Sequence, residues 1–106
     1  MEKINESAIR RLYETVLRLE TVEECAAFFE DICTIKEVQD ISQRLEVAQL
    51  LHDGKNYLEV SRRTGASTAT ICRVNKCLLY GSGGYRTALA KEKEEAERDD
   101  GCGNEA

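Results

Sequence analysis

The residues with the clearest chemical potential lie in one stretch, 57–79, which reads YLEVSRRTGASTATICRVNKCLL. It places short side chains ahead of two long cations, at Ser67, Thr68, Ala69, Thr70, Arg73 and Lys76. Hydroxyl groups, a methyl-sized side chain and cations on one helix suit the base edges of the DNA major groove. The stretch therefore predicts a surface that reads double-stranded DNA.

The same stretch has the layout of a helix-turn-helix. Val60 and the small Ser61 point inward from a first helix, and Gly65 stands where the turn needs a positive φ. Ser67 can cap the second helix, whose apolar face carries Ile71, Val74 and Leu78. A plain packed helical hairpin has the same outline and is the alternative interpretation.

The run TGASTATICR, residues 64–73, resembles the turn and recognition helix of the Trp repressor superfamily, in particular its YerC/YecD branch. The resemblance covers the chain from about the second helix to the glycine-rich loop at Gly81. It implies an all-α fold of about six helices per chain. It also implies an intertwined homodimer that presents two recognition helices.

The resemblance also implies a small-molecule site, because the family clamps tryptophan with two arginines and a threonine. The matching positions here are Thr34, Arg44 and Arg73. The family has Gly directly after the recognition-helix Arg and Ser four residues after that Arg, where this chain has Val74 and Cys77. The β-branched Val74 can fill the space that an indole needs, so a tryptophan site is in doubt and no cofactor is expected. Arg44 has acids on its own helix as alternative partners, and Arg73 has DNA.

DNA contacts carry over only in part. The family Arg that reads a base from the preceding helix corresponds to Leu58, so we expect a different operator. Arg62, Arg63 and Lys55 are candidates for contacts with the phosphate backbone.

The net charge of −5 is unevenly distributed. Residues 1–54 carry −6 and residues 87–106 carry −4, whereas residues 55–86, here called the basic segment, carry +5 and contain only one acid, Glu59. Phosphates respond to charges within a Debye length of roughly 8 Å, and not to the distant total. The only basic block coincides with the helix-turn-helix, which favours nucleic acid as the partner.

Apolar spacing and capping signals predict a single helical domain over residues 1–98. Core and dimerisation helices are expected within 1–54 (about 4–19, from Thr21, and from Thr34 to His52), the DNA-reading head within 55–80 and a last helix at 85–98. We expect residues 99–106 to be a disordered acidic tail. The first helix carries a broad apolar stripe, for which a partner chain is a natural cover; a helix buried in the core of its own chain has the same pattern.

Other classes find little support in the sequence. There is one histidine, no metal-ligand spacing and no catalytic motif, so we do not expect an enzyme. No apolar run suits a membrane span or a signal peptide, and five irregularly spaced cysteines fit a reducing cytoplasm. We predict a cytoplasmic, homodimeric DNA-binding transcription regulator, with a helical protein-interaction adaptor as the alternative.

Overall fold

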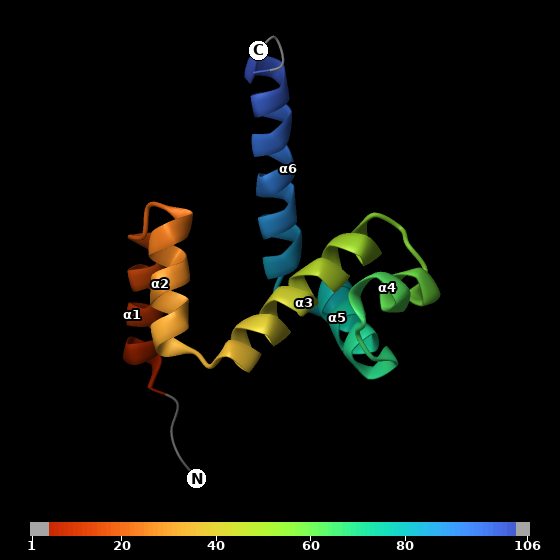
Figure 1. The fold of residues 1–106 in the computed structure, drawn as a ribbon, viewed down its shortest axis with the longest axis horizontal. Helices are drawn as coiled ribbons and strands as arrows, with labels where there is room; N and C mark the ends of the chain where they lie inside the picture. Colours follow the sequence, from red (N-terminus) through yellow and green to blue (C-terminus); the bar gives the residue numbers. More distant parts are fainter. Residues whose placement is uncertain (1–4, 104–106) are drawn as a thin grey trace. The chain divides into compact units, whose positions relative to one another are not determined.

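The computed structural model describes residues 5–103, with side chains for residues 5–98. Six α-helices and no strand form this part of the chain (Figure 1). They are α1 (Glu6–Leu17), α2 (Val22–Ile32), α3 (Ile35–His52), α4 (Tyr57–Thr64), α5 (Thr68–Tyr80) and α6 (Gly84–Gly103). The predicted all-α class is confirmed, and none of the described helices is long and apolar enough to cross a membrane.

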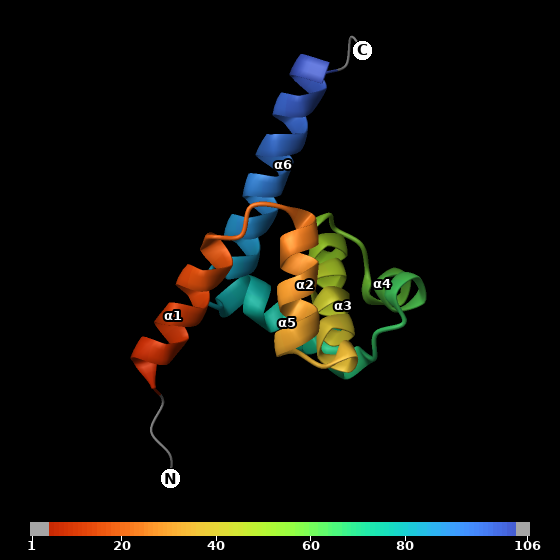
Figure 2. The ribbon, with the colours of Figure 1, turned by 60° about the vertical axis from the view of Figure 1, so that its left-hand side comes forward.

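The chain divides into two compact units, residues 1–39 and residues 40–106. In the first unit, α1 and α2 form a helical hairpin (Figure 2). The Thr21 hydroxyl accepts from the Glu24 N–H at the start of α2. The Thr34 hydroxyl accepts from the Glu37 N–H, and the Glu37 carboxylate accepts from the Thr34 N–H at 2.8 Å. The two predicted capping signals therefore start α2 and α3.

Among residues 5–39, the part of the first unit that the structure describes, no side chain is buried in the single chain. Neither α1 nor α2 contains a buried residue. Large apolar side chains remain exposed on both helices, at Ile9, Leu12, Tyr13, Leu17, Val22 and Ile32. Units below about 40 residues usually need disulfides, metals or oligomerisation to become stable.

The second unit contains the core. Val47, Ala48 and Leu50 of α3 are buried together with residues of all the later elements: Val60, Ala66, Ile71, Val74, Leu78 and Leu89. The expected apolar face of α5 is thus buried, and Leu89 of α6 is buried with it. This core fixes α4 and α5 against the end of α3.

Two helices differ in extent from those expected. The first helix is shorter than 4–19. The Asn5 side chain caps its start by accepting from the Ala8 N–H at 3.0 Å, and Arg18 caps its end with its N–H on the Thr15 carbonyl. The last helix is longer than 85–98 and continues through Gly103, so the prediction of disorder was wrong for residues 99–103. The chain contains no proline that would stop this helix. Once a helix has formed, each further residue adds one backbone hydrogen bond without a new nucleation cost, so the helix can continue. Residues 104–106 lie outside the described residues.

Candidate nucleic-acid interface

The turn between α4 and α5 is closed by local hydrogen bonds. Gly65 has φ +74°, the left-handed conformation predicted from its position, and its N–H donates to the Ser61 carbonyl at 2.8 Å. The Ser61 hydroxyl donates to the Ala66 carbonyl at 3.1 Å, which explains a small polar residue at this half-buried site. The turn therefore has one defined geometry, set by residues within five positions of one another.

Three hydrogen bonds of Thr64 were not predicted from the sequence. Its hydroxyl donates to the Val60 carbonyl at 2.8 Å and accepts from the Ala66 N–H at 3.1 Å. Its own carbonyl accepts from Gln43 Nε2 at 3.2 Å, which ties the turn to α3. A threonine directly before a helix-ending glycine is a signal for the two bonds of its hydroxyl, whereas the bond from Gln43 joins residues 21 positions apart.

The start of α5 is capped as predicted. The Ser67 hydroxyl accepts from the Thr70 N–H and donates to the Thr70 hydroxyl, both at 3.2 Å. Ser67 is exposed and Thr70 is half-buried, while Thr68 and Ala69 are exposed just beyond the cap. The hydroxyl groups of Ser67 and Thr70 are thus hydrogen-bonded to each other at the helix start, whereas Thr68 and Ala69 lie at the surface.

A continuous exposed face runs along α5 opposite the core. Ala69, Arg73 and Lys76 are exposed and recur at helical spacing. Ile71, Val74 and Leu78 bury the other face. The structure therefore presents Ala69, Arg73 and Lys76 on the outer side of α5, and their contact with DNA stays a prediction.

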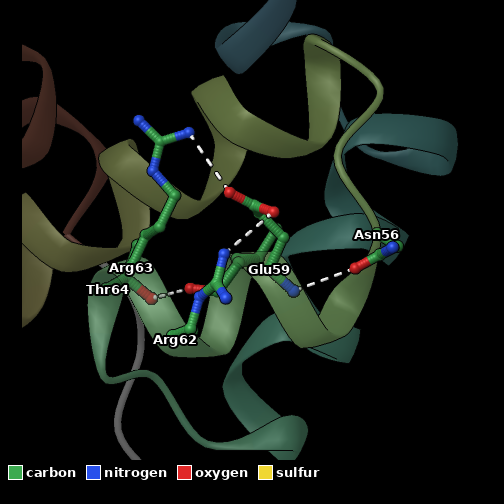
Figure 3. A network of polar contacts seen from close by, with 6 residues as sticks. Asn56, Glu59, Arg62, Arg63 and Thr64 are labelled. Atoms are coloured by element: carbon green, nitrogen blue, oxygen red, sulfur yellow. Dashed lines mark hydrogen bonds and ion pairs between the residues drawn. The ribbon is translucent and has the colours of Figure 1, made fainter.

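The cations of α4 belong to a small network (Figure 3). Glu59 Oε1 lies 3.2 Å from a guanidinium nitrogen of Arg62, and Glu59 Oε2 lies 3.8 Å from one of Arg63. The Arg62 and Arg63 side chains are 72% and 50% exposed, so both remain accessible to a phosphate. Lys55, in the connection between α3 and α4, is also exposed. The role of Glu59 was missed, although spacings of three and four residues on a helix are a usable signal.

The three candidate effector residues have different surroundings. Thr34 serves as the cap of α3 and lines an open groove in the first unit together with Ile35 and Val38. Arg44 is half-buried on α3, in the second unit, and Arg73 is exposed on α5. Val74, which occupies the place of the family glycine, is buried in the core. An effector site at these residues stays a prediction.

Comparisons with known proteins agree with this geometry. Residues 7–93 match the family model of the Trp repressor protein. The uncharacterised protein YerC of Bacillus subtilis (strain 168) is 46% identical over 94 residues, which cover 89% of this chain and 90% of that protein.

Two solved structures are similar to this chain. A crystal structure described as that of a candidate Trp repressor from Staphylococcus aureus has a TM-score of 0.80 and 41% identity, over 82% of this chain and 87% of that one. A TrpR-like protein from Eubacterium eligens has a TM-score of 0.80 and 44% identity, over 82% and 90% of the two chains. The helix-turn-helix, the family match and these neighbours lead to one conclusion: the chain belongs to the Trp repressor family, in its YerC branch.

Proposed function

We propose that this protein is a sequence-specific DNA-binding transcription regulator, acting as a repressor on a pseudopalindromic operator. The observation that carries the proposal is the outer face of α5, which is exposed, polar and cationic and lies within the basic segment. A helix of this kind, fixed from behind by a buried face, can enter the major groove as a rigid unit. Membership of a DNA-binding regulator family supports the proposal.

We propose further that the active form is a homodimer. The support comes from the first unit, where α1 and α2 bury no residue in the single chain. A second copy of the chain could cover the exposed apolar side chains of α1 and α2, because its own α1 and α2 carry the same apolar side chains. Two copies would place two recognition helices in successive major grooves, roughly 34–36 Å apart.

The residues take different roles in this proposal. Thr68, Ala69, Arg73 and Lys76 face the bases, with Ser67 and Thr70 at the helix start. Arg62, Arg63 and Lys55 contact phosphates, which set affinity and register but carry no sequence information. Thr34, Arg44 and Arg73 stay the candidates for holding a small anionic effector. The proposal contains no catalytic role, and the described residues include no group of metal-ligating side chains.

The test is DNA binding by variants of the α5 face. Arg73→Ala and Lys76→Ala should each weaken binding of a duplex selected from random sequences, by roughly 1–3 kcal/mol where the lost contact was bidentate to guanine. Arg10→Ala is the matched control, because Arg10 is an exposed arginine outside the basic segment. Equal binding by all three variants would remove α5 from the interface.

A protein-interaction adaptor is the second candidate. It is favoured by large apolar side chains that are exposed on α4 and α5, the two helices of the helix-turn-helix. These are Leu58 (79% exposed), Leu79 (52%) and Tyr80 (84%). The two functions differ in salt dependence, because contacts with several phosphates weaken steeply as salt rises whereas an apolar contact does not. Binding that persists at high salt would favour the adaptor.

A further inference from the structure

The single acid of the basic segment lies against two of its cations. Glu59 is in the first turn of α4, where its N–H donates to the Asn56 side chain at 2.9 Å. Each of its carboxylate oxygens faces a different arginine, Arg62 at 3.2 Å and Arg63 at 3.8 Å (Figure 3). The Glu59 side chain is 34% exposed, so it is the least exposed of the three. The carboxylate thus offsets one of two positive charges at the point where α4 faces solvent.

The orientation of this carboxylate differs from that of two comparable acids. Glu37 and Glu24 occupy the same position relative to their caps, Thr34 and Thr21. Their carboxylates turn back and accept from backbone N–H groups, of Thr34 at 2.8 Å and of Glu20 at 2.9 Å. The Glu59 carboxylate instead extends forward along the helix to the arginines. Its charge therefore acts on the cations of the basic segment.

We propose that Glu59 is a specificity-determining residue that limits nonspecific DNA binding by holding Arg62 and Arg63. The inference rests on the proposed function. Nonspecific binding to DNA is almost entirely an interaction of cations with phosphates, whereas specific binding adds base contacts. Glu59 lowers the positive charge that is available for nonspecific binding to phosphates. It does not belong to the α5 face that would make the base contacts of specific binding.

Geometry acts in the same direction as charge. A guanidinium group held beside Glu59 reaches phosphates over a smaller range of positions than a free side chain does. Both arginines then contact the backbone chiefly when α5 is docked in the groove. Exposed ion pairs of this kind are weak, so a correctly placed phosphate can replace the carboxylate.

The experiment compares the full-length protein with its Glu59→Gln variant. Glutamine keeps the size of the side chain and is accepted at this position of a capping box. Binding to a random-sequence duplex and to a selected duplex is measured over a series of salt concentrations. The variant should bind the random duplex roughly 3- to 10-fold more tightly at about 0.1 M salt, with a slope of log K against log salt steeper by about 1–2, since each added phosphate contact contributes about 0.9. The selected duplex should gain less, so the ratio of specific to nonspecific affinity falls.

Two controls separate this role from a general change of charge. Glu14→Gln removes the same charge from a matched exposed ion pair, Arg10 Nε to Glu14 Oε2 at 3.2 Å, which lies outside the basic segment, and should change neither affinity. Glu59→Gln in an Arg62→Ala, Arg63→Ala background should lose the gain on the random duplex. Far-ultraviolet circular dichroism checks that each variant is folded.

The outcomes distinguish the two proposals. If the wild-type protein binds DNA and the Glu59→Gln variant binds the random duplex equally or more weakly, the role of Glu59 is overturned and the proposed function is not. A gain that persists without the two arginines also overturns it. A wild-type protein that binds neither duplex overturns the proposed function, and the role of Glu59 with it.

Discussion

Replacing Gly65 by alanine tests how the turn holds α4 and α5 in one geometry. Gly65 has φ +74°, and a Cβ atom added to it would meet nothing within 4 Å. The cost of the substitution is therefore a backbone cost alone. The left-handed conformation costs an L-residue about 1–2 kcal/mol. The loss of conformational freedom in the unfolded chain offsets about 0.4–1 kcal/mol of this.

The net expectation is a loss of about 1 kcal/mol, which corresponds to a fall in Tm of about 4–8 °C for a domain of this size. Gly65→Asn should cost less, because asparagine enters the left-handed region several-fold more often than most residues. Thermal unfolding followed by circular dichroism at one fixed protein concentration measures both values. A Gly65→Ala protein as stable as the wild type, with no advantage for asparagine, would refute the reasoning.

Gly81 provides an internal comparison with a different physical cause. Its φ of −85° suits any residue, but an added Cβ would lie 2.5 Å from the Cys77 carbonyl oxygen. The clash is with backbone in the last turn of α5, so the turn itself must shift. Gly81→Ala should therefore destabilise the protein more than Gly65→Ala, and asparagine at 81 should not improve on alanine. The reverse order would contradict this account of the two glycines.

Two further predictions concern the dimer and the core. Leu12→Glu places a charge on the exposed apolar surface of α1; it should shift the protein from dimer to monomer in sedimentation experiments, while Arg10→Ala should not. A dimer that survives Leu12→Glu would exclude this part of α1 from the interface. Val74→Ala removes two buried carbons and should cost on the order of 2 kcal/mol in urea unfolding. It should not create tryptophan binding in calorimetry, because Val74 packs inside the core; tryptophan binding by this variant would show that Val74 does block a pocket.

Local features of the fold were predictable from the sequence because their causes are local. Asn56, Ser67 and Gly65 cap helices or close the turn through contacts within a few residues, and these contacts depend on residue type and spacing. The burial of Ile71, Val74 and Leu78 followed from helical periodicity in the same way. The helix-turn-helix could therefore be identified within residues 55–80, where α4 and α5 lie.

Features that depend on distant or competing contacts were not predictable in this way. The bond from Gln43 to the Thr64 carbonyl joins two residues that no local pattern relates. The end of α6 was misplaced because its polar, acidic composition was taken as a sign of disorder, although the helix continues to Gly103. The Glu59 carboxylate could have accepted from a backbone N–H at the helix start, and it lies beside Arg62 and Arg63 instead. A cap residue followed three positions later by Glu is compatible with either arrangement, so the sequence does not decide between them.

The most direct test of the central claim is selection of random duplexes by the purified protein, followed by affinity measurements on the enriched duplex. The account predicts a two-fold symmetric site with half-sites about 10–10.5 base pairs apart. It also predicts salt-sensitive binding with a Kd of roughly 10⁻⁸–10⁻¹¹ M. Selection that enriches no sequence, together with no salt-sensitive binding to any duplex, would contradict the account and leave the protein-interaction adaptor as the better explanation of the exposed face.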